Sequence, residues 1–234
     1  MTAPAVALPA GFRSHVANIG IKDDTPDFVV VATERAVPTA AVFTRSRFAG
    51  PSVTLSRTQV ADGLAAAVVV ISKNANVATG PQGHEDAIEV VRATAERLGC
   101  DPSEVVIAST GVIGRPYPME RVRAGIAALP GQLSSTDALG PATGMMTTDT
   151  VPKLAEATVD GSGARVVGMA KGVGMIEPDM ATHISLLFTD AEVAAPELDA
   201  TFRRVVNRTF NCVSIDTDTS TSDTSMVMAS GAAG

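Results

Sequence analysis

The sequence has 234 residues, of which 45% are hydrophobic and 18% charged, and this composition is typical of a globular protein with a sizeable buried core. Its formal net charge of −7 argues against general electrostatic attraction to nucleic acid or to an anionic membrane. No apolar run reaches the roughly 18 to 20 residues of a membrane span, and no secretory signal pattern begins the chain, so we expect a cytoplasmic protein.

The first half of the chain alternates β-rich and helical segments. Residues 27–32 and 40–44 are short β-rich runs, and Pro38 between them favours a hairpin-type connection. Residues 64–72 (LAAAVVVIS) are almost continuously apolar, as expected of a strand that is buried on both faces. The polar turn 73–76 (KNAN) follows this strand.

A helix is expected over residues 85–98 (EDAIEVVRATAERL), because apolar residues recur at helical spacing and Gly99 follows as a C-cap. The predicted apolar stripe consists of Ile88, Val91, Ala95 and Leu98. A buried strand at 105–108 then leads to the polar turn 109–111 (STG). Residues 119–129, which lie between two prolines, form the next predicted helix.

The second half begins with a small, polar stretch at 131–139, which indicates a surface loop. Residues 154–159 and 164–169 flank the sequence DGSG, a strong signal for a β-hairpin. The later predicted elements are a strand at 184–188, a helix at 196–210 with Leu198, Phe202 and Val205 on its apolar side, and a short apolar run at 226–228. The chain then stops at Gly234, as expected of a C-terminally truncated gene product.

The segment 171–182 (KGVGMIEPDMAT) carries the pattern with most chemical meaning. A threonine hydroxyl is a weak nucleophile without an adjacent base, and a freed α-amino group with a pKa of about 7.7 to 8.0 can serve as that base. Cleavage of the backbone before Thr182 would create both groups in one residue, and the glycines and Pro178 can provide the strained turn that cleavage needs. An ordinary turn before a strand is the other interpretation.

Three long motifs in this order resemble the ornithine acetyltransferase family, also called bifunctional glutamate N-acetyltransferases, of the cyclic arginine pathway. The motifs are STGVIG at 109–114, MTTDTVPK at 146–153 and KGVGMIEPDMAT at 171–182. The resemblance runs from about Gly11 to the end of the chain. Further matching segments are FTR at 43–45 and NANVATG at 74–80, and two more, 46–53 and 214–224, are most similar to the branch associated with clavulanic-acid-type gene clusters.

The resemblance implies an α/β fold, namely an αββα layered sandwich of the N-terminal-nucleophile type. It implies self-cleavage between Ala181 and Thr182, so that residues 1–181 become an α chain and residues 182–234 begin a β chain. The two chains remain together, in a higher homo-oligomer. The substrates implied are N-acetylornithine as acetyl donor and glutamate as acceptor, with acetyl-CoA as a possible further substrate and no cofactor.

The resemblance also assigns individual residues. Thr182 is the nucleophile that carries the acetyl group, and Thr110 and Gly111 form the oxyanion hole. Thr148, Lys171 and Thr182 match substrate-binding positions. The chemistry agrees, because a turn after a strand can aim a hydroxyl and a backbone N–H at one developing negative charge, and a lysine suits an α-carboxylate.

Two other functions remain open from the sequence. A related amidase or aminopeptidase would use the same nucleophile with water as acceptor, and a non-catalytic precursor would stay uncut.

His183 is expected to point away from the Thr182 side chain, because neighbouring side chains on a strand face opposite ways. Asp216, Asp218 and Asp223 lack the pattern of a calcium loop and are expected to form turns and hydrogen bonds near the active site, so no metal site is predicted. Cys100 and Cys212 are expected to be reduced, structural thiols.

Overall fold

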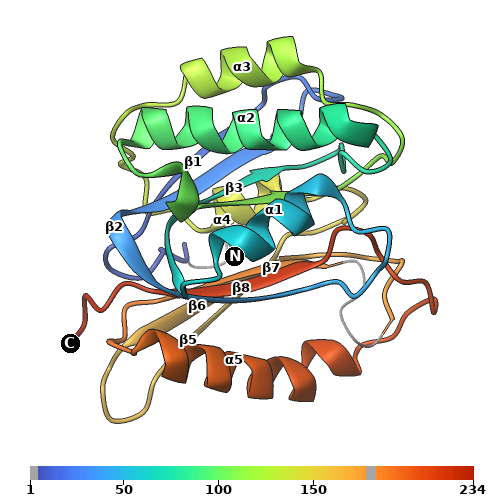
Figure 1. Ribbon diagram of the computed structural model, residues 1–234. Helices are drawn as coiled ribbons and strands as arrows, with labels where there is room; N and C mark the ends of the chain where they lie inside the picture. Colours follow the sequence, from blue (N-terminus) through green and yellow to red (C-terminus); the bar gives the residue numbers. More distant parts are fainter. Residues whose placement is uncertain (1–4, 178–182) are drawn as a thin grey trace.

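The computed structural model describes residues 5–177 and 183–234. Two β-sheets lie face to face, and helices cover the outer face of each sheet (Figure 1). These four layers confirm the predicted αββα sandwich. The layers follow from the sequence, because strands that are apolar on both faces must be covered on both sides.

The described strands are β1 (Arg13–Ala17), β2 (Phe28–Phe43), β3 (Leu64–Ile71), β4 (Val105–Ser109), β5 (Lys153–Thr158), β6 (Arg165–Lys171), β7 (Ile184–Thr189) and β8 (Thr224–Ala229). The described α-helices are α1 (Pro51–Gln59), α2 (Gly80–Leu98), α3 (Met119–Ala127), α4 (Leu139–Gly144) and α5 (Ala195–Arg208). Short 3-10 turns occupy Pro102–Glu104 and Phe210–Cys212. The hairpin predicted around DGSG is confirmed as β5 and β6.

The strand β2 runs through both sheets, so the expected hairpin connection near Pro38 was wrong. The first half of β2 pairs with β1 and β3, and its second half, from Thr39, pairs with β8. The pairing with β3 shifts register between Ala32 and Val37. Proline lacks a donor but keeps extended backbone geometry, so β2 continues through Pro38, which pairs with Leu64 just after the irregularity.

Strand order places the ends of neighbouring strands side by side within each sheet. In the first sheet, β3 and β4 are parallel, so the turns that follow them leave the same edge. In the second sheet the order is β2-β8-β7-β6-β5, and β7 is parallel to β8. Lys171 at the end of β6 pairs with Ile184 at the start of β7, and Ile184 pairs with Thr224 at the start of β8.

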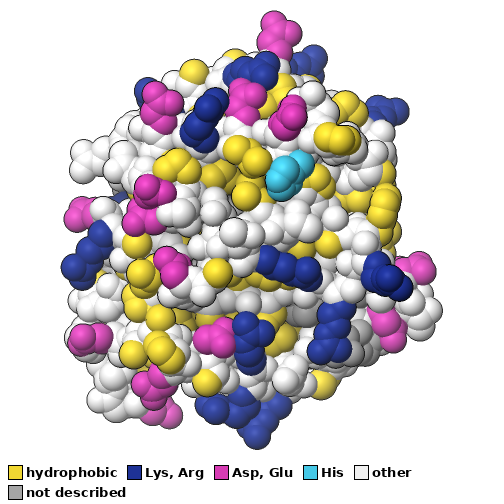
Figure 2. Space-filling view, viewed as in Figure 1, with side chains coloured by type: hydrophobic (Ala, Val, Ile, Leu, Met, Phe, Trp, Pro, Cys, Tyr) yellow, Lys and Arg dark blue, Asp and Glu magenta, His cyan; other side chains and the backbone are white. Residues whose placement is uncertain are grey.

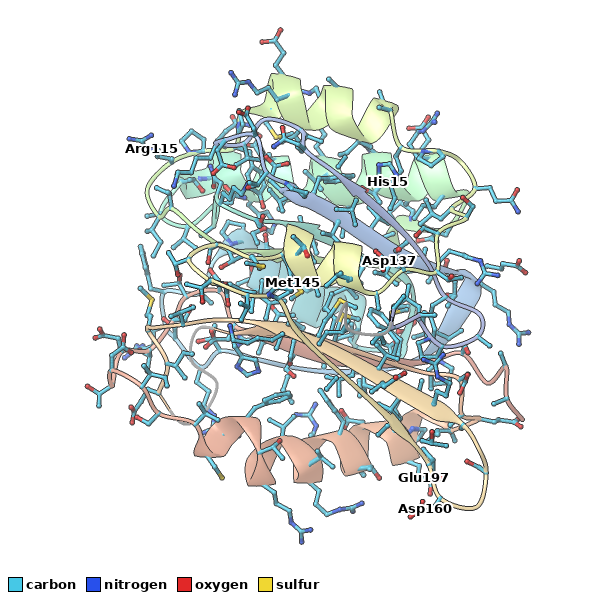
Figure 3. The ribbon with its side chains drawn as sticks, turned by 180° about the vertical axis from the view of Figure 1, so that it is seen from behind. His15, Arg115, Asp137, Met145, Asp160 and Glu197 are labelled. Atoms are coloured by element: carbon cyan, nitrogen blue, oxygen red, sulfur yellow. The ribbon has the colours of Figure 1, made fainter. Side chains whose placement is uncertain are left out.

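Three hydrophobic clusters fill the spaces between successive layers of the fold. On β2, Val29 and Val31 point into the cluster between the two sheets, whereas Phe28 and Val30 point towards α2 and α3. The third cluster lies between the second sheet and α5. Seen from behind, α4 with Met145 lies between the two sheets (Figure 3), and Met145 is buried in the inter-sheet cluster.

Two predicted helices differ from the structure by small rotations or shifts. The helix α2 begins at Gly80 rather than Glu85, because Pro81 fits the first turn of a helix, and it ends before Gly99, which has φ of 74°. Ile88 was expected in the apolar stripe but is 44% exposed. On α5, Val206 rather than Val205 packs against the sheet.

The surface carries charges of both signs. Acidic and basic side chains are interspersed on the face shown in Figure 2, and basic ones gather over α5. In the part of the chain that the structure describes, no helix combines the length and the apolar character needed to cross a membrane. Both cysteines are free thiols, and Cys212 is exposed rather than structural. Cys100 is partly buried, and burial raises the pKa of its thiol to about 11.

Candidate active site

A pocket of about 460 Å³ lies where the ends of β3, β4 and β6 meet the segment 214–222. Four of the residues predicted from the sequence line it, namely Thr110, Gly111, Thr148 and Lys171. The other two predicted residues, Ala181 and Thr182, lie outside the described residues. The structure therefore brings together every predicted site residue that it describes.

Thr110 and Lys171 meet across the two sheets. Thr110 follows β4 in the first sheet, Lys171 ends β6 in the second, and the Lys171 ammonium donates a hydrogen bond to the Thr110 Oγ1 over 3.0 Å. Both side chains are buried, with exposed fractions of 4% and 3%. Because the Thr110 oxygen accepts this bond, its own hydroxyl hydrogen remains available to donate to another group.

Gly111 lies at a close approach of two turns. Its φ is 129°, a value that residues with a side chain rarely adopt, and a Cβ atom there would lie 2.2 Å from the carbonyl carbon of Lys73. The Thr110 N–H donates to the Ile71 carbonyl, and the Val112 N–H donates to the Lys73 carbonyl. The turns after β3 and β4 are thus hydrogen-bonded to each other, and only glycine fits between them.

Gly111→Ala is expected to destabilise the fold strongly. The backbone strain alone costs about 1 to 3 kcal/mol, and the overlap with Lys73 adds to it. Denaturant unfolding measures the loss, with Gly114→Ala as the matched control. Gly114 also has a positive φ, of 82°, but its Cβ would meet no atom within 4 Å. Equal losses in the two variants would show that the close approach does not matter.

Charges around Lys171 determine its electrostatic environment. Burial lowers the pKa of Lys171, while the negative charges of Asp149 and Asp223 oppose that shift. Burial likewise acts to raise the pKa of Asp149, but hydrogen bonds from the Gly172 N–H and from Lys153 outweigh it and hold that pKa below its ordinary value. Burial raises the pKa of Asp223 to about 7. Two acidic groups therefore act on Lys171, and the pKa of one of them, Asp149, is held low.

Thr148 lies at the rim of the pocket and is exposed. The neighbouring Asp149 is buried, and it accepts the backbone N–H groups of Thr147 and Gly172. One carboxylate therefore ties the turn before β5 to the end of β6. This arrangement places Thr148 and Lys171 on the same pocket.

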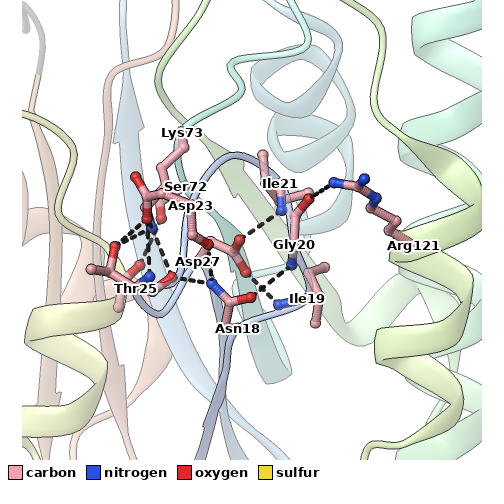
Figure 4. A network of polar contacts seen from close by, with 11 residues as sticks. Asn18, Ile19, Gly20, Ile21, Asp23, Thr25, Asp27, Ser72, Lys73 and Arg121 are labelled. Carbon is pink, nitrogen blue, oxygen red and sulfur yellow. Dashed lines mark hydrogen bonds and ion pairs between the residues drawn. The ribbon is translucent and has the colours of Figure 1, made fainter.

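Lys73 and the loop before β2 line one side of the pocket and are joined by polar contacts (Figure 4). The sequence analysis did not predict this part of the site. The Lys73 ammonium donates to Asp23 Oδ1 over 2.6 Å and to the Thr25 carbonyl over 2.8 Å, and the bond from Lys73 holds the pKa of Asp23 well below its usual range. Asp27 accepts the N–H groups of Ile19 and Ile21 and so fixes the loop. The polar turn KNAN after a buried strand was the available signal for Lys73.

A buried hydroxyl cluster behind Thr110 was also missed. Ser109 Oγ lies 2.6 Å from Ser52 Oγ and also bonds to the Tyr117 hydroxyl. Burial raises the pKa of Tyr117 to about 12, so this phenol stays protonated. The cluster anchors the end of β4 on the side away from the pocket.

His183 and two of the acidic residues make hydrogen bonds close to the pocket. The His183 ring bonds to Ser185 Oγ and packs on Phe210 with ring centroids 4.6 Å apart. Its orientation relative to Thr182 cannot be compared, since Thr182 is outside the described residues. Asp216 and Asp223 accept backbone hydrogen bonds next to the pocket, as predicted. Among residues 5–177 and 183–234, no group of three His, Cys, Asp or Glu side chains could hold a metal ion.

Comparisons with known proteins find a matching family model and similar sequences. The model of the ArgJ family matches residues 13–234. "Arginine biosynthesis bifunctional protein ArgJ 2" from Nostoc sp. is 48% identical over 234 residues, which are 100% of this chain and 60% of that protein. "Glutamate N-acetyltransferase Oat2" from Streptomyces clavuligerus is 54% identical over 227 residues, 97% of this chain and 57% of that protein. The chain thus spans less than two thirds of the length of these relatives.

Solved structures show the same fold. The arginine biosynthesis bifunctional protein argJ from Bacillus halodurans superposes with a TM-score of 0.69 at 31% identity, over 77% of this chain and 100% of that one. Ornithine acetyltransferase from Mycobacterium tuberculosis, solved with ornithine, gives 0.61 at 29% identity, over 76% and 96%. An L-aminopeptidase D-Ala-esterase/amidase from Ochrobactrum anthropi, described as a variant of the Ntn hydrolase fold, gives 0.52 at 14% identity, over 98% and 76%, and this likeness concerns the fold alone.

Proposed function

Because this chain belongs to the ArgJ family, we propose that it moves an acetyl group from N-acetylornithine to glutamate through an acyl-threonine intermediate. The observation that carries the proposal is the meeting of Thr110, Gly111 and Lys171 in one pocket. These residues supply a hydroxyl donor, a backbone N–H and a buried cation. A negatively charged transition state and a carboxylate substrate need that combination.

Maturation is the first proposed reaction. The Thr182 hydroxyl oxygen attacks the carbonyl carbon of Ala181, the C–N bond between the two residues breaks, and the nitrogen of Thr182 takes the hydroxyl proton. Water then hydrolyses the resulting ester. Residues 1–181 end as a carboxylate, and Thr182 gains a free α-amino group that can act as its own base.

Acetyl transfer follows by double displacement. The Thr182 oxygen attacks the acetyl carbonyl, and the α-amino group takes the hydroxyl proton. The Thr110 hydroxyl and the Gly111 N–H stabilise the negative oxygen that forms. Ornithine leaves with the proton as its amide C–N bond breaks. The amino group of glutamate then attacks the acetyl-threonine ester, the ester C–O bond breaks to give N-acetylglutamate, and the α-amino group of Thr182 passes the proton lost by glutamate to the Thr182 oxygen. Lys171 binds the α-carboxylate that both substrates share, and Thr148 contacts substrate at the rim.

The two chains produced by cleavage are expected to stay together. The strands β7 and β8 follow the cut, yet they lie between β2 and β6, which precede it. β7 pairs with β6 over six residues, and β8 pairs with β2 over five. Separating the chains would expose these strand edges and the inter-sheet core, so the pieces remain associated. A higher homo-oligomer and a cytoplasmic location belong to the same proposal.

Hydrolysis of an amide is the alternative function, with water in place of glutamate. The aminopeptidase likeness is one of fold at 14% identity, whereas the relative named as a glutamate N-acetyltransferase is 54% identical. The test is to incubate the purified protein with N-acetylornithine, with and without glutamate and with and without acetyl-CoA. We expect N-acetylglutamate only when glutamate is present. Release of free acetate at the same rate without glutamate would identify a hydrolase.

Lys171→Met is expected to weaken the use of both substrates. The substitution keeps a long side chain and removes the charge, so the buried position can still be filled. A charge-assisted bond to a carboxylate contributes roughly 1.5 to 3 kcal/mol, so KM for N-acetylornithine and for glutamate should each rise about 10- to 150-fold. Steady-state kinetics on the cut form of the variant measures both values.

Two further variants separate charge from geometry. Lys22→Met removes an exposed positive charge from the lining of the same pocket and should change KM much less. Lys171→Arg keeps the charge and should retain part of the affinity. Unchanged KM values in Lys171→Met would make Lys171 a structural residue and remove it from the substrate site.

A further inference from the structure

Asp216 holds the backbone of the glycine-rich segment that precedes residues 178–182. Its Oδ2 accepts the Met175 N–H over 2.6 Å, and its Oδ1 accepts the Ile176 N–H over 2.8 Å. The Ile215 N–H also donates to the Ile176 carbonyl over 2.8 Å. Met175 has a positive φ of 58° outside any strand or helix, so side-chain contacts of this kind are what maintain the turn.

Asp223 holds the backbone on the other side of the same residues. Its Oδ1 accepts the His183 N–H over 2.9 Å, and the Thr224 N–H donates to the His183 carbonyl over 3.2 Å. The nitrogen of His183 is bonded directly to the carbonyl carbon of Thr182, so Asp223 acts one covalent bond away from that residue.

The Asp223 carboxyl is unusual because of its burial. The residue has an exposed fraction of 0%, and within the described part of the chain its Oδ2 has no hydrogen-bond partner. A buried polar atom without a partner costs stability. This acidic side chain is buried at a cost to the fold, and its contact with the main chain is the bond that it accepts from the His183 N–H.

We propose that Asp216 and Asp223 are positioning residues that fix the backbone on the two sides of the bond to be cut, an inference that rests on the proposed function. Both carboxylates come from one segment, 214–224, which follows the cut. Asp216 therefore holds the end of the α chain, and Asp223 holds the residue attached to the nucleophile. Asp216 serves cleavage above all, whereas Asp223 serves cleavage and also acetyl transfer.

The physical reason is that an intramolecular attack requires accurate placement of the reacting atoms. The attacking oxygen must lie about 3 to 3.5 Å from the carbonyl carbon, and a misplacement of about 1 Å can cost roughly 100-fold in rate. Asp216 holds the N–H groups of Met175 and Ile176, and Asp223 holds that of His183, so the backbone is fixed at described residues on both sides of the bond to be cut. Loss of either one should slow the attack without removing any reacting group.

Asp216→Asn tests the upstream contact. Asparagine has one acceptor where aspartate has two, so one of the two N–H groups that Asp216 now accepts must face the amide NH₂. Cutting, followed by denaturing gel over time after synthesis, should slow about tenfold or more, in line with the cost of misplacement. The effect on cutting should exceed the effect on the kcat of the cut form.

Two variants test the contact between Asp223 and the His183 N–H. Asp223→Asn keeps an acceptor for the His183 N–H and should retain most of the cutting and turnover. Asp223→Ala removes the acceptor, and both the cutting rate and the kcat of the cut form should fall about tenfold or more, with KM for both substrates little changed. A merely structural role would instead lower the melting temperature in both variants and leave kcat of the folded enzyme unchanged.

Asp199→Asn is the matched control, since that carboxylate lies partly exposed on α5 and pairs with Arg203 one helical turn away. Wild-type cutting rates in Asp216→Asn and in Asp223→Ala would overturn the inference. Failure of the proposed function gives a different result, because the unmodified protein would then remain uncut or transfer no acetyl group.

Discussion

Replacing Thr182 with alanine is expected to leave a single uncut chain and to abolish acetyl transfer. The proposed cleavage begins with attack of the Thr182 oxygen on the Ala181 carbonyl, and alanine has no oxygen to attack. Thr182→Ser keeps the hydroxyl and should retain some cutting, at a reduced rate because its side chain is less restricted in rotation. Denaturing gel electrophoresis and the transfer assay measure the two effects.

The control for this pair is Thr158→Ala, which removes a threonine hydroxyl from an exposed position at the end of β5. It should be cut and active like the unmodified protein. Complete cutting of Thr182→Ala would contradict the assignment of the nucleophile, since another residue would then have to break the bond.

Thr110→Ala is expected to lower kcat about 100- to 1,000-fold with KM little changed, because an oxyanion donor acts where charge develops in the transition state. The structure strengthens this expectation. The Thr110 oxygen accepts a bond from the Lys171 ammonium, which polarises the hydroxyl and leaves its hydrogen free to donate. Steady-state kinetics on the cut form measures kcat and KM separately.

Thr110→Ser is the informative companion variant. It keeps the hydroxyl that accepts from Lys171 and should restore much of kcat, whereas Thr110→Val keeps the shape without the hydroxyl and should behave like alanine. A large rise in KM at normal kcat in Thr110→Ala would make Thr110 a substrate-binding residue instead.

The fold was predictable from the sequence where apolar patterns are local. The run at 64–72 became β3, and the DGSG turn joined β5 and β6, because burial on both faces and turn chemistry both act over a few residues. The continuity of β2 could not be predicted in this way. Its two halves pair with strands far along the chain, β3 and β8, and this pairing outweighs the local effect of Pro38.

The candidate site was predictable only in part, and for a similar reason. Thr110, Gly111, Thr148 and Lys171 were identified from motifs, and the structure places them on one pocket. The supporting contacts join residues far apart in sequence. Asp216 bonds to residues 40 and 41 positions away, and Lys73 bonds to Asp23 from 50 positions away. No periodicity or local spacing reports a hydrogen bond of that kind, so these residues emerge only from the folded chain.

Mass spectrometry and N-terminal sequencing of the purified, unmodified protein test the central claim most directly. The account predicts two polypeptides that copurify, one of which ends at Ala181 while the other begins with Thr182. A single intact chain that spans residues 181 and 182, in a protein that still transfers acetyl groups, would contradict it.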